Sequence, residues 1–169
     1  MSPRSAEELL ADIRARILRV QPSELSGVVE RGGLVVDIRP ERQRRAEGRL
    51  PMAVVVERNV LEWRFDLMGG VAMAEVTGYN QEVVVVCSEG YASSLAATSL
   101  RELGFVHAAD LDGGFRAWTA WLERMRWTSV ATLGSGQMSR HSPLLGRVDR
   151  RSPGLNRRSV SAPRRRLDA

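Results

Sequence analysis

The chain has 169 residues, of which 43% are hydrophobic, and this length allows one ordinary domain but not two. Its formal charge of +5 is uneven, because residues 1–127 carry 16 arginines and 18 acids, whereas residues 128–169 carry nine arginines and two acids. No apolar run approaches the roughly 20 residues of a membrane span, and a single cysteine excludes an internal disulfide. We therefore expect a cytoplasmic protein with no membrane association.

The first 31 residues predict two helices. Ser5 can cap the first, over residues 5–20, and Glu8 completes a capping box ahead of a repeating apolar face. We interpret this helix as packed on the domain, and a partner-binding role is the less favoured alternative. The second helix is predicted over residues 22–31, and a pair of glycines ends it.

Two short strands follow, separated by a charged segment. Residues 34–37 predict a buried strand, and residues 53–56 predict a second one. Residues 41–47 between them read as a charged helix or loop with a solvated face. Asn59 can cap a further helix, and the glycine-rich residues 68–80 are expected to connect it to the next strand.

The most informative stretch begins with four consecutive valines at residues 83–86. Such a short apolar, β-branched run predicts a strand buried on both faces, as in a parallel sheet. Cys87 follows where this strand ends, and Gly90 allows a turn with positive φ. Ser93 or Ser94 can then cap the next helix.

Cys87 occupies a position suited to thiolate chemistry. Ligands of open parallel α/β sheets bind at the carboxyl ends of the strands. A loop that turns into a helix also aims backbone N–H groups at that end. These groups could hold Cys87 as a reactive thiolate, together with an anion beside its sulfur. The alternative is a structural cysteine, because free cysteines are often buried, but the layout favours the reactive interpretation.

Three charged residues follow predicted strands at the same edge of the sheet. Asp37 and Arg39 lie at the carboxyl end of the strand over residues 34–37 and could brace the loops around Cys87 through ionic hydrogen bonds. Direct substrate contact is the less favoured role for this pair. Arg58 follows the next strand, and its position alone makes it a candidate for the rim of the pocket.

The remaining sequence predicts a weak strand within residues 105–111 and a helix over residues 115–126. Beyond it, apolar periodicity stops, and Ser, Gly, Pro and Arg dominate residues 128–169, so we expect a disordered tail. Its arginines could contact nucleic acid or an acidic partner electrostatically. We do not favour that role, because the tail has no aromatic residue to stack on bases.

Four segments resemble motifs of the rhodanese-like domain family. Residues 87–93, Cys-Ser-Glu-Gly-Tyr-Ala-Ser, resemble its active-site loop, C-x-x-G-x-(R/T)-(S/A). Residues 35–39 resemble its vDvR motif, residues 47–53 its GHIPGA segment and residues 111–118 its LxGGxxaW segment. The resemblance implies an α/β fold with an open parallel sheet and helices on both faces. The four segments span about residues 22–122, and we expect residues 1–127 to form one rhodanese-like domain that includes the N-terminal helix.

The resemblance also implies an activity. Cys87 would be the nucleophile of a sulfurtransferase or persulfide carrier that needs no cofactor and no metal. It would take sulfane sulfur from a donor such as thiosulfate or a persulfide and pass it to a thiol or to cyanide. The substrate would be bound by the active-site loop residues Ser88, Glu89, Gly90, Tyr91, Ala92 and Ser93.

Two loop residues depart from the family pattern. Ala92 stands where many members have arginine, so one side-chain contact is lost. Glu89 adds a negative charge that opposes both a thiolate and an anionic donor. We therefore expect poor activity with thiosulfate, and a catalytically silent binding or redox-sensing module is the alternative. A related phosphatase or arsenate reductase would need C-x5-R, and Ser93 occupies the position of that arginine.

Overall fold

The computed structural model describes residues 3–134, which contain a five-stranded, fully parallel sheet. Its strands are β1 (Leu18–Val20), β2 (Leu34–Asp37), β3 (Ala53–Val55), β4 (Val83–Val86) and β5 (Ala108–Leu111). Their order across the sheet is β1-β5-β4-β2-β3, so β4 is central. All four residues of β4 are buried. The predicted parallel α/β fold is confirmed.

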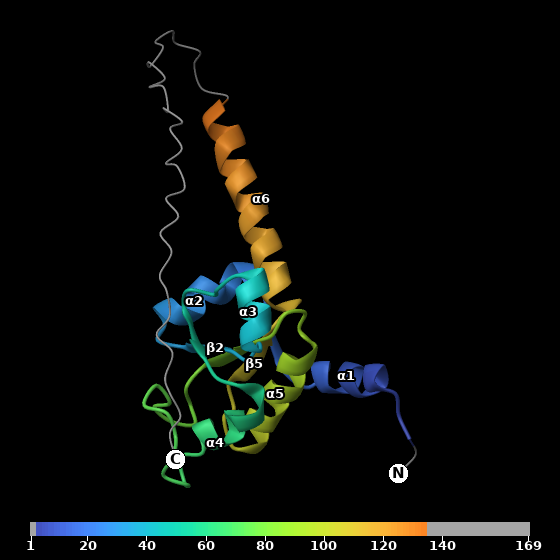
Figure 1. The fold of residues 1–169 in the computed structure, drawn as a ribbon, viewed down its shortest axis with the longest axis vertical. Helices are drawn as coiled ribbons and strands as arrows, with labels where there is room; N and C mark the ends of the chain where they lie inside the picture. The colour runs from blue at the N-terminus through green and yellow to red at the C-terminus, as the bar shows by residue number, and fades with distance from the viewer. Residues whose placement is uncertain (1–2, 135–169) are drawn as a thin grey trace, which may run out of the picture. The chain divides into compact units, whose positions relative to one another are not determined.

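Helices cover both faces of this sheet (Figure 1). They are α1 (Ala6–Arg14), α2 (Leu25–Glu30), α3 (Glu41–Glu47), α4 (Leu61–Phe65), α5 (Tyr91–Glu102) and α6 (Gly114–Gly134). Two 3-10 turns, η1 (Pro22–Glu24) and η2 (Arg58–Val60), directly precede α2 and α4. Helices α4 and α5 pack on one face of the sheet, and α2 and α6 pack on the other.

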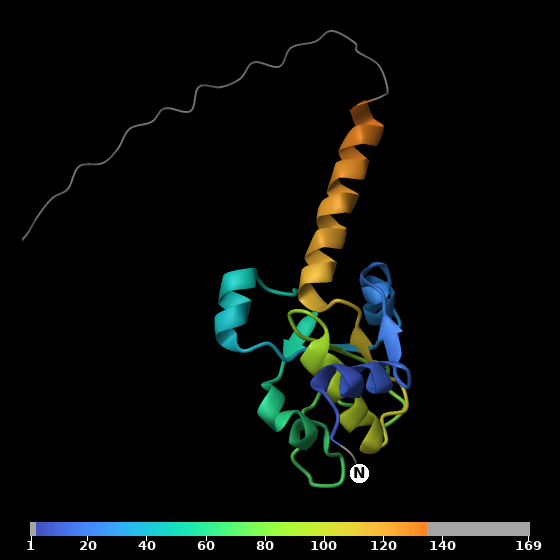
Figure 2. The same cartoon turned by 90° about the vertical axis from the view of Figure 1, so that its right-hand side faces the viewer.

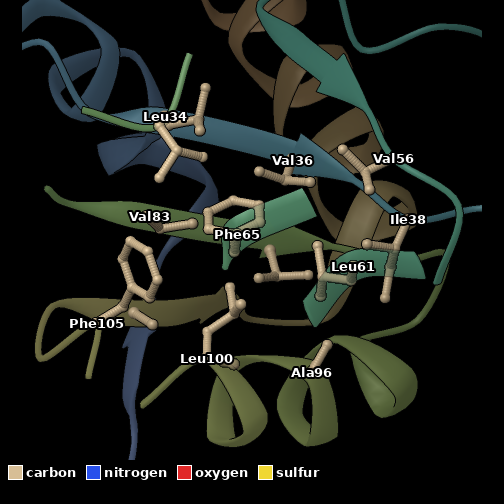
Figure 3. Close-up of a cluster of buried hydrophobic side chains, with 14 of the residues drawn as sticks. Leu34, Val36, Ile38, Val56, Leu61, Phe65, Val83, Ala96, Leu100 and Phe105 are labelled. Atoms are coloured by element: carbon tan, nitrogen blue, oxygen red, sulfur yellow. The ribbon is translucent and has the colours of Figure 1, made fainter. Parts of the chain in front are cut away.

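The face under α4 and α5 carries the larger apolar cluster (Figure 3). Its labelled members are Leu34, Val36, Ile38, Val56, Leu61, Phe65, Val83, Ala96, Leu100 and Phe105. The rings of Phe65 and Phe105 meet edge to face, with centroids 5.3 Å apart. Cys87 also belongs to this cluster, so the strand that supplies the core leads directly to the candidate nucleophile.

The opposite face uses the alternate valines of β4. Val83 and Val85 face α5, whereas Val84 and Val86 pack with Leu25 of α2 and Phe115 of α6. Side chains of a strand alternate between its two faces, so an unbroken apolar run suits a strand that is covered on both. Fully burying a valine side chain stabilises the folded state by about 1.5–3 kcal/mol relative to leaving it exposed.

The N-terminal segment differs from the prediction of one helix over residues 5–20. The capping box of Ser5 and Glu8 is present, but α1 ends at Arg14. Residues 18–20 instead form the edge strand β1, which pairs in parallel with β5. The apolar residues here fit a helical spacing, but pairing with a strand far along the chain outweighs that local pattern.

The last helix, α6, is longer than the predicted helix over residues 115–126, because it continues to Gly134 (Figure 2). The expected boundary at Thr128 therefore falls inside α6. Residues 135–169 lie outside the described part of the chain, so disorder and weak nucleic-acid contact there stay predictions. Within residues 3–134, none of the helices is both long and apolar enough to span a bilayer.

Candidate active site

Cys87 begins a short loop that turns directly into α5. Its sulfur accepts hydrogen bonds from the backbone N–H groups of Gly90 (3.1 Å) and Ser93 (3.4 Å), and it lies 3.2 Å from the Ser93 hydroxyl. Gly90 takes the left-handed conformation, with φ 82°, which lets the loop curl around the sulfur. The predicted cap by Ser93 or Ser94 is wrong, because α5 begins at Tyr91 and the sulfur itself accepts a first-turn N–H group.

The Cys87 side chain is largely enclosed, with 8% of its surface exposed. It packs in the apolar cluster beneath α4 and α5, while its sulfur faces the loop amides. Both interpretations of the sequence thus describe part of what is found, a core cysteine whose sulfur lies in a nest of N–H groups. The positive end of the α5 dipole favours negative charge at this sulfur.

The first turn of α6 holds the carbonyl groups of the Cys87 loop. The N–H of Phe115 donates to the Cys87 carbonyl (2.8 Å), and that of Arg116 donates to the Ser88 carbonyl (3.1 Å). Carbonyl oxygens turned toward the sulfur would repel a thiolate, so these bonds favour the arrangement with N–H groups inward. Gly114 permits the close approach, since a Cβ built there would lie 2.5 Å from the Cys87 carbonyl oxygen.

Asp37 and Arg39 form a buried ion pair at the end of β2. Arg39 donates through Nη2 to Asp37 Oδ2 (2.7 Å) and through Nε to Oδ1 (3.0 Å). Arg39 also donates to Glu47 (3.1 Å) and to the Gly48 carbonyl (3.0 Å), and its Cζ lies 3.7 Å from the Phe115 ring centroid. Burial alone would lower the pKa of Arg39, but the two carboxylates outweigh it and raise that pKa. The pair thus contacts both α3 and α6.

Glu47, the last residue of α3, joins this ion pair to the Cys87 loop. Its carboxylate accepts hydrogen bonds from the hydroxyl of Ser88 (2.8 Å) and from the guanidinium groups of Arg39 (3.1 Å) and Arg116 (3.1 Å). Partial burial would raise the pKa of Glu47, but these bonds outweigh it and hold the pKa below its ordinary value of 4.5. Glu47 was not among the predicted site residues, although it opens the segment resembling GHIPGA.

Glu89 is paired across the loop with Arg116, which also binds Glu47. The expected repulsion from Glu89 is therefore opposed by a neighbouring cation. Both side chains of the pair are substantially exposed, so solvent screens the interaction. Ala92 is exposed and offers no polar side chain. Poor activity with thiosulfate stays a prediction.

Arg58 has no hydrogen bond to the Cys87 loop within residues 3–134. Its guanidinium donates to Glu62 of α4 at 2.8 Å, one turn further along the chain. The suggested position at the rim of the pocket is thus unsupported by any contact. Within the same residues, no group of three or more His, Cys, Asp or Glu side chains is arranged to hold a metal ion.

A second polar network, formed by residues that were not predicted to belong to the site, reaches the loop through Arg14 of α1. Arg14 donates to the Gly90 carbonyl (2.9 Å) and to Ser94 Oγ (3.3 Å). Ser94 Oγ lies 2.7 Å from Asp110 Oδ2, and Arg19 donates to the other oxygen of that fully buried carboxylate (3.1 Å). Arg14 had no distinguishing signal, because it sits among several similar arginines near the end of a helix.

The protein is an α/β protein with a parallel sheet, and the loop after the central strand β4 begins with Cys87 and curls around its sulfur. The chain is a member of the rhodanese-like domain family, and the family model for the rhodanese-like domain matches residues 21–120. This match begins after α1 and β1 and ends within α6. The expected membership is confirmed.

Two curated relatives are thiosulfate sulfurtransferases named GlpE. The protein of Pseudomonas savastanoi pv. phaseolicola is 28% identical over 102 residues, which cover 60% of this chain and 87% of the relative. The protein of Pseudoalteromonas translucida is 43% identical over 42 residues, which cover 25% of this chain and 40% of the relative.

Solved structures share the fold at low identity. A protein of unknown function from Rhodopseudomonas palustris, described as a possible tyrosine phosphatase, has a TM-score of 0.63 at 24% identity, over 71% of this chain and 92% of that one. The human single-domain sulfurtransferase TSTD1 has a TM-score of 0.50 at 24% identity, over 63% of this chain and 96% of that one. Both comparisons concern the fold alone.

Proposed function

We propose that this protein is a sulfurtransferase or persulfide carrier that works through a persulfide on Cys87. The observation that carries the proposal is the pair of backbone N–H groups, from Gly90 and Ser93, directed at the Cys87 sulfur. Family membership and two relatives named as thiosulfate sulfurtransferases support it.

In the first half-reaction, the Cys87 thiolate attacks the outer, sulfane sulfur of the donor. With thiosulfate, a new S–S bond forms to Cys87, and the S–S bond within thiosulfate breaks. Sulfite leaves with the bonding electron pair, and Cys87 becomes a persulfide whose outer sulfur is negative. No net oxidation occurs, because the donor supplies sulfur already at the sulfane level.

In the second half-reaction, an acceptor nucleophile attacks the outer sulfur of the Cys87 persulfide. The enzyme S–S bond breaks, and the Cys87 thiolate leaves with its electrons. A thiolate acceptor becomes a persulfide, and cyanide becomes thiocyanate. Two half-reactions through one covalent intermediate predict ping-pong kinetics.

The start of α5 supplies donors for the outer sulfur. The first N–H groups of a helix have no intrahelical acceptor, and Ser93 N–H already donates to the Cys87 sulfur. The N–H groups of Tyr91 and Ala92 are thereby suited to the negative outer sulfur, whose charge they would stabilise during transfer. The hydrogen bond that the Ser88 hydroxyl donates to Glu47, and those that α6 amides donate to the loop carbonyls, would keep this arrangement in place.

The reaction needs Cys87 reduced, and we propose the cytoplasm as its location, since a chain with a single cysteine suits a reducing compartment. We do not propose for this chain the tyrosine phosphatase activity that is named as possible for the R. palustris protein. Ser93 occupies the position at which that chemistry requires an arginine.

Intact-mass measurement tests the proposal. The protein is incubated with thiosulfate or with a persulfide donor, and we expect the mass of one added sulfur atom, reversed by cyanide. Cys87→Ser should gain nothing, and since Cys87 is the only cysteine, no other thiol can confuse the result. Absence of added sulfur with both donors would favour the catalytically silent binding or redox-sensing module. Equal addition to Cys87→Ser would exclude Cys87 as the carrier.

A further inference from the structure

We propose that Arg14 of α1 is a positioning residue for sulfur transfer, which orients the peptide between Gly90 and Tyr91 so that the Tyr91 N–H group faces the outer sulfur. This inference rests on the proposed function. It adds a residue from outside the part of the chain that matches the family model, because that match begins at residue 21.

Helix α1 lies beside α5 in both views of the fold (Figures 1 and 2). Its last residue, Arg14, reaches three neighbouring groups of the Cys87 loop and the start of α5. The guanidinium donates to the Gly90 carbonyl at 2.9 Å and to Ser94 Oγ at 3.3 Å, and its Cζ lies 5.6 Å from the centroid of the Tyr91 ring. Within residues 3–134, Arg14 is the one arginine whose side chain donates to the Gly90 carbonyl.

The geometry of one peptide unit connects these contacts to the sulfur. A trans peptide is planar, so the Gly90 carbonyl and the Tyr91 N–H point in opposite directions. Arg14 and the Ser94 hydroxyl, which lies 2.8 Å from the same oxygen, fix the carbonyl side. The N–H of Tyr91 therefore faces the end of α5 at which Cys87 lies. As the N-cap of α5, Gly90 also offers this carbonyl to the first intrahelical hydrogen bond, and Arg14 adds a charged donor to the same oxygen.

Ser94, which Arg14 contacts, is itself held by a buried carboxylate. Ser94 Oγ contacts the Asp110 carboxylate, which is fully buried and is held in turn by Arg19 of β1. Arg19 also pairs with Asp112 at 2.8 Å. Residues 14 and 19 thus connect the N-terminal segment to the loop through the end of β5, and a charged fork is well suited to hold two acceptors at once.

Steady-state kinetics of Arg14→Ala, Arg14→Lys and the matched control Arg16→Ala test this role. Arg16 lies two residues away, its side chain is 70% exposed and it pairs with Asp12, so it should not affect the loop. We expect Arg14→Ala to lower kcat about tenfold, equivalent to about 1.4 kcal/mol, with little change in the donor KM. Arg14→Lys keeps the charge but loses the fork, so we expect a loss of about threefold.

If Arg14 only packs α1, both Arg14 variants should have a lower melting temperature, but kcat should not fall selectively while the donor KM is unchanged. A wild-type kcat in Arg14→Ala would overturn the proposal. If Arg14→Ala does not fold, Arg14→Lys decides, since wild-type kcat in that variant also contradicts the inference. Amide hydrogen exchange at the start of α5 needs no turnover. It should be faster in Arg14→Ala than in Arg16→Ala even if wild-type protein transfers no sulfur, which separates failure of this inference from failure of the proposed function.

Discussion

Replacing Gly114 with alanine should force the Cys87 loop away from the first turn of α6. Gly114 has φ 65°, and a Cβ there would lie 2.5 Å from the Cys87 carbonyl oxygen and 2.8 Å from the backbone nitrogens of Glu89 and Gly90. All three are backbone atoms, so no side-chain rotation can relieve the overlap. The loop itself must move, and with it the amides that face the sulfur.

The expected size of the effect has two parts. An alanine in the left-handed region costs about 1–2 kcal/mol. Overpacking a close-fitting site adds about 1–3 kcal/mol. Gly114→Ala should therefore lower the free energy of unfolding by about 2–5 kcal/mol. A displacement of about 1 Å at reacting groups can cost about 100-fold in rate, so sulfur transfer should fall by up to that factor.

Gly32→Ala is the matched control, because Gly32 has φ 82° and no atom lies within 4 Å of its built Cβ. It carries the backbone strain without the collision. Urea unfolding and sulfur transfer are measured on both variants and on the wild type. Gly32→Ala should lose about 1–2 kcal/mol and keep full transfer. If Gly114→Ala loses no more stability and no more activity than Gly32→Ala, the proposed packing of α6 against the loop is refuted.

Two further predictions concern the charged network. Arg39→Ala leaves the Asp37 carboxylate buried without its ion-pair partner, so urea unfolding should show a loss of about 3–5 kcal/mol, whereas the exposed Arg45→Ala should change little. The lowered pKa of Glu47 means that its bonds stabilise the folded protein above the ordinary value of 4.5, and that this stability is lost as the pH falls through the folded pKa. The urea midpoint should consequently fall more steeply from about pH 6 to about pH 3 in the wild type than in Glu47→Gln. Equal pH dependence of the two midpoints would contradict a stabilising role of the ionised Glu47.

The central elements of the fold were predictable because their local and tertiary requirements agree. Four adjacent valines suit a strand covered on both faces, and residues 83–86 are the middle strand of the sheet. The strand at residues 34–37 was also predictable, because its short apolar run suits a buried strand. β1 was not predictable, since its three residues form a strand only through pairing with β5, and their local spacing suits a helix equally well.

Some residues of the candidate site were predictable from the sequence and others were not. Cys87, Asp37 and Arg39 stand at the ends of recognisable strands, so their meeting at one edge of the sheet followed from the topology. Arg14 and Glu47 have no such signal, because each is one of several similar charged residues on a helix. Only tertiary packing shows which of these charges turns toward the loop.

The hydrogen bonds from the first turn of α6 to the Cys87 loop have a consequence for biosynthesis. Cys87 leaves the ribosome before β5, which covers one edge of β4, and before the amides of Phe115 and Arg116, which bind the loop carbonyls. A nascent chain that stalls between these points carries a bare strand edge and a thiol open to oxidants. Both are protected once residue 116 has left the ribosome, so the candidate site is completed only after all five strands of the sheet have been translated.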